Sequence, residues 1–226
     1  MENSLFDLKV SKVAKIDTKY RKIETEIPHP NDLLVMKEIS KLEASFGQNS
    51  LPLVWERASD YSIYDRWGNK WIDLSSGIFV ANSGHAIGAK EVVHSAHKPL
   101  LHSYYYPTTE RLNFLTELKK ILPDYLDGRL NIVNTGTEAS ERAIKIARIW
   151  GAAKSPDKNV IIGFRRNFHG KTMGAMMAAT TPEAKSWIPF HDPNMIQISF
   201  PYPWLFDGLG AAEKSKAEKK FFFDEL

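Results

Sequence analysis

The sequence predicts an α/β protein in which a mostly parallel sheet, covered by helices on both faces, follows a small antiparallel sheet. Two observations lead to this fold class. Between residues 129 and 179, short apolar segments of strand character alternate with segments of helical periodicity, an order that is typical of βαβ units. Between residues 53 and 73, short segments rich in Val, Ile, Tyr and Trp flank a polar turn, which indicates an antiparallel hairpin.

The composition is that of a globular protein, and it excludes several function classes. Of the 226 residues, 43% are hydrophobic and 25% charged, and the absence of cysteine rules out disulfides and thiolate zinc sites. The net charge of +3 is too small and too evenly spread to favour nucleic acid. No apolar run approaches the roughly 18 to 20 residues that cross a bilayer, and residues 1–27 lack the apolar core of a signal peptide. We expect a cytoplasmic protein with no nucleic-acid or membrane partner.

The first 88 residues divide into two predicted segments. Residues 1–27 are polar and weakly patterned, and we interpret them as an N-terminal arm. Residues 28–88 are predicted to hold one helix and a small antiparallel hairpin segment. The helix is expected over about 33–46 with Gly47 at its end, the strands over 53–55, 62–64 and 70–72, and the turn over 65–69.

Residues 89–226 are interpreted as a large domain that is incomplete in this sequence. Its predicted strands are short, and helices follow them in regular alternation. The last segment looks helical and ends on apolar residues without a capping signal. The predicted helices cover 89–101, 109–122, 137–150, 171–179 and 210–226, and the predicted strands cover 129–134 and 159–164.

The most informative stretch runs from residue 131 to residue 141, where a predicted strand passes through a glycine directly into a helix. At such a helix start several backbone N–H groups have no partner within the helix and the macrodipole is positive, so an anion is stabilised there. Gly136 lets the backbone approach a phosphate closely, and the Thr135 and Thr137 hydroxyls can add hydrogen bonds. The structural alternative is that Thr135 only caps the helix while Glu138 completes a capping box.

The helix that follows is predicted to be amphipathic, with an apolar face opposite a charged one. Two pairs on the charged face have the favourable i,i+4 order, with the glutamate N-terminal to the cation. The apolar face comprises Ala139, Ala143, Ile146, Ala147 and Trp150, and the two expected pairs are Glu138 with Arg142 and Glu141 with Lys145.

A second segment, one βα unit later, strengthens the case for a cofactor. The predicted strand over 159–164 leads to Phe168 and His169, then to a glycine and a helix of small residues. An aromatic ring in this position can stack on a heteroaromatic cofactor, an interaction worth about 1 kcal/mol beyond burial. The alternative is that Phe168 belongs to the core and that His169 is a satisfied buried imidazole. No carboxylate completes a metal shell around His94 and His97, so no metal is expected.

Five motifs, which follow one another along the chain, together resemble those of the class III (omega-type) pyridoxal-phosphate aminotransferase family. The resemblance covers residues 28–226, and its last motif is similar to the 4-aminobutyrate branch. The motifs are Gly136-Thr137-Glu138-Ala139, Phe168-His169-Gly170-Lys171-Thr172, the hairpin over 64–73, the loop over 76–85, and Phe200-Pro201-Tyr202-Pro203.

The resemblance implies fold type I, a homodimer, pyridoxal 5′-phosphate as the cofactor, and small amino-acid and 2-oxo-acid substrates. It places Gly136 and Thr137 at the cofactor phosphate, Phe168 over one face of the cofactor ring, and His169 beside it, where it orients the loop. Two further sets of residues match substrate positions. They are Ile78 and Phe79 in the pocket, and Lys171 at a position that is often arginine and would pair with a substrate carboxylate.

The resemblance also implies that the chain holds no catalytic residue. The family's Schiff-base lysine, and the aspartate that pairs with the ring nitrogen, are expected beyond residue 226, so we expect this chain alone to be inactive. The predicted function is therefore the N-terminal part of an aminotransferase that acts on an omega-amino acid such as 4-aminobutyrate. Two alternatives stay open: an amino-acid racemase of the same family, and a short non-catalytic module that binds a partner.

Overall fold

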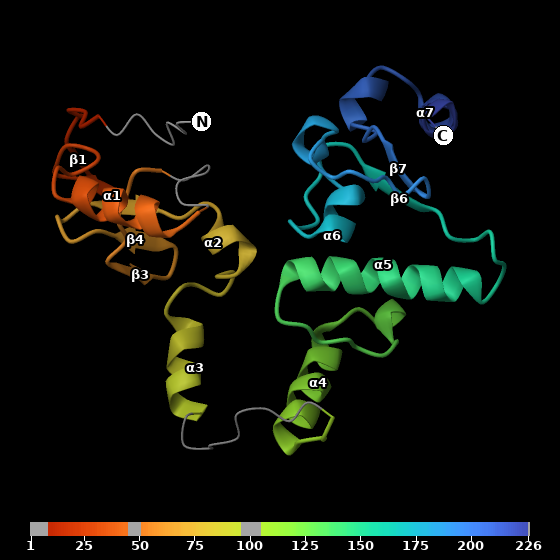
Figure 1. Ribbon diagram of the computed structural model, residues 1–226, viewed down its shortest axis with the longest axis horizontal. Coiled ribbons are helices and arrows are strands. Elements are labelled where there is room, and N and C mark those ends of the chain that lie inside the picture. Colours follow the sequence, from red (N-terminus) through yellow and green to blue (C-terminus); the bar gives the residue numbers. More distant parts are fainter. Residues whose placement is uncertain (1–8, 45–50, 96–104, 226) are drawn as a thin grey trace. The chain divides into compact units, whose positions relative to one another are not determined.

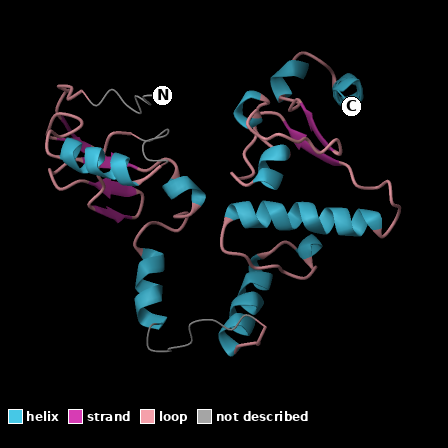
Figure 2. Cartoon of the chain, in the orientation of Figure 1, coloured by secondary structure: helices cyan, strands magenta, loops and turns pink. Residues whose placement is uncertain are grey.

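The chain folds as two compact units, Met1–Pro107 and Thr108–Leu226 (Figure 1). The computed structural model describes residues 9–44, 51–95 and 105–225. The first unit carries an antiparallel sheet, whereas the second carries a parallel strand pair and the longer helices (Figure 2). The predicted divisions after residues 27 and 88 stay a prediction. None of the helices in the described ranges is long and apolar enough to cross a membrane.

The sheet of the first unit has the order β1-β2-β5-β4-β3, and its pairings are antiparallel. The predicted hairpin is confirmed, because Ser62 pairs with Ile72 and Tyr64 with Lys70. The leading residues, interpreted as an arm, supply the first two strands of this sheet. The strands are β1 (Ile16–Asp17), β2 (Lys22–Ile23), β3 (Arg57–Ser59), β4 (Ser62–Tyr64) and β5 (Lys70–Ile72).

The turn of the hairpin also fastens the leading strands. Asp65 Oδ1 accepts hydrogen bonds from the backbone N–H groups of Trp67 and Asn69, both at 2.9 Å, and Gly68 takes the positive φ of 90° that closes the turn. The buried Asn69 side chain then accepts from the backbone N–H of Glu24 at 2.6 Å. One side chain therefore joins the turn to the segment that precedes it by more than 40 residues.

The predicted strand over 53–55 is wrong, since the strand lies at Arg57–Ser59. The Leu53 backbone N–H bonds locally to the Leu51 carbonyl at 2.8 Å and so is not available to a neighbouring strand. The helices of this unit are α1 (Asp32–Leu42), α2 (Ser76–Phe79) and α3 (Ile87–Ser95). The predicted end of the first helix near residue 46 is wrong, because α1 ends at Leu42 and Glu43 is already extended, with a φ of −112°. The predicted cap Gly47, and the end of the helix expected over 89–101, lie outside the described residues.

The second unit is built around a parallel pair, β6 (Ile161–Phe164) and β7 (Met195–Ile198), which confirms the expected parallel strands. The predicted strand over 129–134 is wrong, because these residues pair with no neighbour among those described, and a strand needs such a ladder. The helices are α4 (Thr109–Ile121), α5 (Gly136–Ala152), α6 (Met173–Met177) and α7 (Ala211–Glu225), with 3₁₀ turns at Asp124–Leu126, Glu183–Lys185 and Pro203–Phe206.

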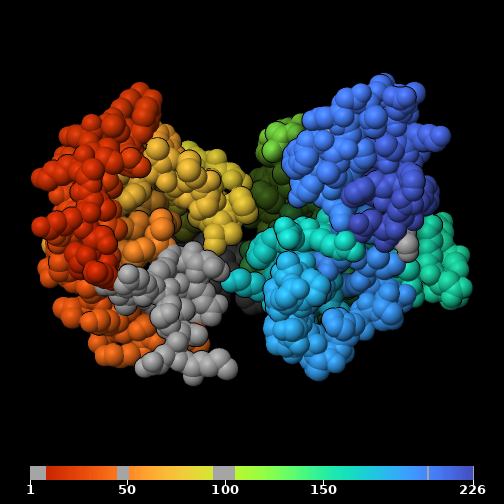
Figure 3. All heavy atoms as spheres, turned by 90° about the horizontal axis from the view of Figure 1, so that it is seen from above, coloured from red at the N-terminus to blue at the C-terminus, as the bar shows by residue number. Residues whose placement is uncertain are grey.

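The core of the second unit lies where α6 and the residues after it cover the strand pair. Ala175, Ala178 and Ile198 are buried there. A Cβ on Gly163 would stand 2.2 Å from the Ala178 carbonyl oxygen, so only glycine allows this strand to lie so close. The space-filling view shows the atoms of α7 gathered on one flank of this unit (Figure 3).

The predicted apolar face of α5 is exposed in this structure. Ile146 is 50% exposed and Trp150 57% exposed. The two expected i,i+4 ion pairs on the opposite face do not form. Glu138 instead folds back onto the helix start, and Glu141 accepts from Thr172 just before α6 and from Ala175 within it, because backbone and hydroxyl donors lie within their reach.

Candidate cofactor site

The N-terminus of α5 is organised by a complete capping box. The Thr135 hydroxyl accepts from the Glu138 backbone N–H at 3.1 Å, and the Glu138 carboxylate accepts from the Thr135 and Asn134 N–H groups at 3.0 and 2.7 Å. In the described part of the chain, the N–H groups of Gly136 and Thr137 have no such partner. The structural alternative is therefore present, and it leaves two donors at the positive end of a 17-residue helix.

The segment over 167–175 packs directly on this helix start. A Cβ on Gly170 would stand 2.4 Å from the Thr137 hydroxyl oxygen, and Gly170 has a φ of 135° that L side chains rarely adopt. One turn further along α5, the Glu141 carboxylate accepts from the Thr172 hydroxyl, and from the Ala175 N–H at 3.0 Å. The two motifs, about thirty residues apart in the sequence, thus form one braced unit.

The remaining predicted cofactor residues lie in that same segment. Phe168 is 66% exposed, which leaves its ring free for a stacking partner. The Asn167 side-chain nitrogen donates to His169 Nε2 at 2.8 Å, so the imidazole ties down the residues that flank Phe168. The ammonium of Lys171 is exposed and has no ion-pair partner among the described residues.

These residues fit a phosphate monoester attached to an aromatic ring. Gly136 has open space where a Cβ would stand, so an anion can approach its backbone. The Thr137 side chain is half-buried and held in place by Gly170, which restricts the positions of its hydroxyl. The combination of two free N–H groups, one hydroxyl and one exposed ring matches the donor set that a phosphorylated heteroaromatic cofactor needs.

The predicted substrate residues Ile78 and Phe79 lie in the first unit, on α2. Their side chains are 70% and 73% exposed. Ile78 borders an apolar hollow of about 790 Å³, which Met36, Trp55 and Trp71 also line. An exposed apolar pair beside such a hollow suits contact with the hydrocarbon part of a small molecule.

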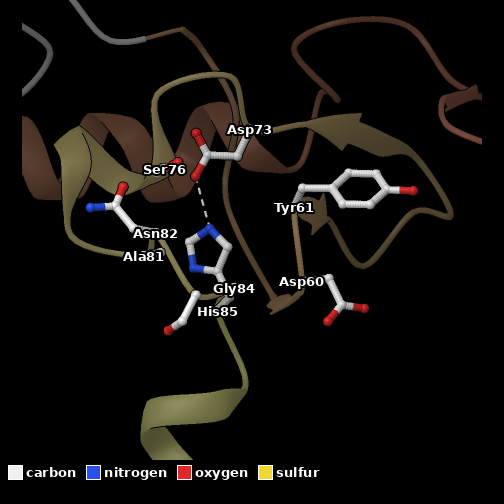
Figure 4. A pocket seen from close by; sticks show the side chains of 9 residues that line it. Asp60, Tyr61, Asp73, Ser76, Ala81, Asn82, Gly84 and His85 are labelled. Carbon is white, nitrogen blue, oxygen red and sulfur yellow. Dashed lines mark hydrogen bonds and ion pairs between the residues drawn. The ribbon is translucent and has the colours of Figure 1, made fainter. Parts of the chain in front are cut away.

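The α2 turn lies beside a polar hollow of about 260 Å³ in which Asp73 faces His85 (Figure 4). His85 Nε2 and Asp73 Oδ2 are 2.8 Å apart, and the Asp73 side chain is only 4% exposed. Burial alone would raise the pKa of Asp73, but hydrogen bonds from His85, Ser75 and Gly77 outweigh it and lower the pKa to about 2. Asp73 therefore stays ionised at neutral pH.

Sequence reasoning assigned no part in the site to Asp73, His85 or Glu141. The first two appear in the hairpin and loop motifs, but a spacing of 12 residues does not indicate contact. Glu141 was expected to pair with Lys145 on the charged face of the helix, whereas it bonds to Thr172. A polar residue directly after the strand Lys70–Ile72 is the one signal that could have singled out Asp73.

The family model for aminotransferase class-III matches residues 44–221. The chain belongs to the class-III aminotransferase family. Membership confirms the resemblance read from the motifs, and it confirms pyridoxal phosphate as the cofactor. The assignment of individual residues to the cofactor and to the substrate stays a prediction.

Two curated relatives illustrate the range of the family. The mitochondrial acetylornithine aminotransferase of Saccharomyces cerevisiae is 35% identical over 143 residues, which cover 60% of this chain and 33% of the relative. The diaminobutyrate–2-oxoglutarate transaminase of Oceanobacillus iheyensis is 31% identical over 152 residues, which cover 65% and 34%. The chain spans about a third of the length of these relatives.

A solved structure confirms the fold. The (S)-enantioselective omega-transaminase from Thermomicrobium roseum superposes with a TM-score of 0.70 at 24% identity, over 85% of this chain and 45% of that one. The chain therefore has the α/β architecture of fold type I, as the sequence predicts. The names of the two curated relatives do not support the 4-aminobutyrate branch that the segment over 200–203 resembles.

Proposed function

We propose that this chain supplies the phosphate-binding part of an aminotransferase that moves an amino group from an omega-amino acid to a 2-oxo acid. The observation that carries the proposal is the start of α5, where the N–H groups of Gly136 and Thr137 are free of partners within the described residues. Gly170 and Glu141 brace this helix start against the segment that holds Phe168. The family membership supplies the cofactor that fits it.

Each residue of this unit has a proposed task. Gly136 and Thr137 bind the cofactor phosphate, Phe168 covers one face of the cofactor ring, and His169 orients the loop through Asn167. When bound, pyridoxal phosphate supplies an electron sink for the amino-bearing carbon of the substrate. The lysine and the aspartate that complete such a site are expected elsewhere in the complete protein, so the role of this chain is binding and orientation.

The proposed amino donors carry an amino group away from the carboxylate. Acetylornithine and diaminobutyrate, in the names of the relatives, are amino acids with a second nitrogen on their chain. 4-Aminobutyrate, which the motif over 200–203 favours, places its only amino group at the chain end. In this proposal Ile78 and Phe79 contact the hydrocarbon chain of the substrate. Lys171 pairs with the substrate carboxylate through a single ammonium group, whereas an arginine would bind it with two parallel N–H groups.

We also propose that the complete protein is a cytoplasmic homodimer. The support is the resemblance together with the absence of cysteine from the chain. Analytical ultracentrifugation of the complete protein tests the dimer, and fractionation of cells that express it tests the compartment. A monomer, or a membrane-bound pool, would contradict this part of the proposal.

The proposed phosphate site is tested with pyridoxamine 5′-phosphate, which carries no aldehyde and so does not react with surface lysines. Its affinity is measured by fluorescence titration on the chain and on two variants. Thr137→Val keeps the side-chain shape and removes a charge-assisted hydrogen bond, so the affinity should fall by about 10-fold to 150-fold. Thr135→Val removes only the cap, and should reduce stability while changing affinity by less than about threefold.

If Thr137→Val binds as well as the unchanged chain and Thr135→Val does not fold, the helix start is a cap and not a phosphate site. If both variants bind equally well and fold, the phosphate binds elsewhere. Either result contradicts the assignment of Gly136 and Thr137.

A further inference from the structure

The α2 turn has a backbone conformation that its side chains do not favour. Four consecutive residues have positive φ: Ser76 at 50°, Gly77 at 59°, Ile78 at 62° and Phe79 at 67°. Only glycine adopts this left-handed region freely, and for a β-branched residue such as Ile78 it is a rare outlier. A left-handed turn of this kind persists only where the surrounding structure holds it, and such strain gathers at functional sites.

Backbone bonds hold part of the turn, from the Phe79 N–H to the Ser75 carbonyl at 2.8 Å and from the Val80 N–H to the Ser76 carbonyl at 2.9 Å. The Asp73 side chain supplies the hold at its start. The Asp73 carboxylate accepts from the Gly77 N–H at 2.8 Å, inside the left-handed turn, and from the Ser75 N–H and hydroxyl at 3.0 and 2.8 Å, just before it. The same oxygen that accepts from Gly77 also accepts from His85 Nε2 at 2.8 Å. The carboxylate thus joins the start of the loop, the turn and the far end of the loop.

Both ends of the loop are tied to the same short turn between β3 and β4. The Asp73 N–H donates to the Tyr61 carbonyl at 2.8 Å, and the His85 N–H donates to the Asp60 carbonyl at 2.9 Å. A Cβ on Gly84 would stand 3.1 Å from the Asp60 Cα, so the loop returns in close backbone contact. Figure 4 shows the His85 ring turned toward Asp73 across this closed loop.

We call the bonded pair Asp73 and His85, with the bonds of Asp73 to Ser75 and Gly77, the clasp. Its hydrogen bonds require a carboxylate at residue 73. Its partners are N–H and O–H donors, and Asp73 accepts from them with both oxygens. An asparagine has one carbonyl oxygen, so its NH₂ group would face either the Ser75 or the Gly77 N–H. A buried donor that faces another donor is costly, and the left-handed turn would lose one of its fastenings.

We propose that Asp73 and His85 are positioning residues that hold the left-handed α2 turn and thereby present Ile78 and Phe79 to the substrate. The two presented side chains are more than two-thirds exposed, whereas the Asp73 side chain that holds them is almost fully buried. The substrate contact itself rests on the function proposed above. The clasp rests only on the geometry of the first unit.

The clasp is tested on the chain by amide hydrogen exchange at Gly77 and by chymotryptic cleavage after Phe79. Asp73→Asn should raise both rates by about tenfold or more, while the amides of the β4–β5 hairpin change little. Asp60→Asn is the matched control, because it removes a carboxylate from the same hollow. The Asp60 carboxylate has no hydrogen bond to any described residue, so both rates should stay within about twofold.

A second background separates this positioning role from a general folding role. Glycine adopts positive φ without strain, so in Ile78→Gly the turn needs less holding. In that background Asp73→Asn should change the two rates by less than about threefold. The proposal is overturned if Asp73→Asn raises the exchange and cleavage rates by the same factor with and without Ile78→Gly. It is also overturned if Asp73→Asn raises these rates less than about twofold in the unchanged chain.

If Asp73→Asn does not fold, His85→Ala is used in its place. We expect His85→Ala to raise the exchange and cleavage rates about fivefold, and by a smaller factor when Ile78→Gly is also present. An increase that does not shrink overturns the proposal. Pyridoxamine 5′-phosphate binding is measured on each variant, and should be unchanged by Asp73→Asn and His85→Ala. A chain that shows the clasp effects but binds no pyridoxamine 5′-phosphate contradicts the proposed function and leaves the clasp standing.

Discussion

Replacement of Gly170 by alanine tests the packing that braces the phosphate site. A Cβ at this position would stand 2.4 Å from the Thr137 hydroxyl oxygen and 2.5 Å from its methyl carbon. Overpacking of this kind costs about 1 to 3 kcal/mol. The φ of 135° adds about 1 to 3 kcal/mol for any residue with a side chain. Gly170→Ala should therefore lower the free energy of unfolding by about 2 to 6 kcal/mol.

Gly136→Ala is the matched control, because a Cβ there meets no atom within 4 Å. Alanine is a better helix former than glycine, so this variant should be neutral or stabilised by up to about 1 kcal/mol. The free energies come from urea denaturation followed by far-UV circular dichroism. The contrast between two glycines of the same site separates steric cost from a general sensitivity of the loop.

A double variant separates the two parts of the cost. Thr137→Ala removes the two atoms nearest to the added Cβ, whereas the Thr137 Cβ, at 2.8 Å, stays. The combination with Gly170→Ala should recover about 1 to 3 kcal/mol of the steric part but none of the backbone part. If the stability of Gly170→Ala stays within about 0.5 kcal/mol of the unchanged chain, the close contact of Gly170 with Thr137 carries no steric cost. A full recovery in the double variant would show that the backbone conformation of Gly170 adds no cost of its own.

Three further predictions concern titration, burial and stacking. The pKa of Asp73 is lowered from 3.8 to about 2, so the ionised side chain should contribute about 2 kcal/mol to the free energy of unfolding. This contribution should be complete above about pH 4 and lost as the pH falls toward about 2, and the acid denaturation of Asp73→Asn should lack it. Lys185→Met leaves Gln197 Oε1 and the Met177 carbonyl without a buried donor, and should destabilise the chain by about 1 to 3 kcal/mol in urea; equal stability would mean that these bonds contribute nothing. Phe168→Leu keeps most of the apolar contact but removes the stack, so bound pyridoxamine 5′-phosphate should change its absorption spectrum while its affinity falls by less than about tenfold; an unchanged spectrum would place the ring elsewhere.

Features that depend on neighbouring residues follow from the sequence. The hairpin over 62–72 forms where a local rule places it, because Asp65 and Gly68 set the turn. The start of α5 forms for the same reason, since Thr135 and Glu138 satisfy each other within one helical turn. Helix beginnings and tight turns are decided over three or four residues, so a single sequence carries enough information to find them.

Features that depend on distant partners do not follow from the sequence. The segment over 129–134 has the composition of a strand, yet a strand exists only where a neighbour offers a ladder. The strand at Met195–Ile198 was missed because four apolar and polar residues in a row carry no distinctive period. The contact of Gly170 with Thr137 joins segments more than thirty residues apart, and no local pattern encodes it.

The candidate site also contains both kinds of feature, those set by neighbouring residues and those set by distant partners. The motifs named the residues at the helix start, because a glycine and a hydroxyl before an amphipathic helix have a physical meaning on their own. The bracing by Glu141 and the clasp of Asp73 with His85 needed the fold. The sequence alone does not show which donors lie near a carboxylate, because donors such as His85 and Ala175 come from distant positions in the chain.

The proposed function requires that the N-terminus of α5 binds the phosphate of the cofactor. The most direct measurement is a titration of the ¹⁵N-labelled chain with pyridoxamine 5′-phosphate, followed through the backbone amide resonances. We expect saturable shifts that are largest at Gly136 and Thr137, with smaller shifts at Gly170, and their loss in Thr137→Val. Saturable shifts centred on the start of α4 at Thr109, or none at Gly136 and Thr137, would contradict it.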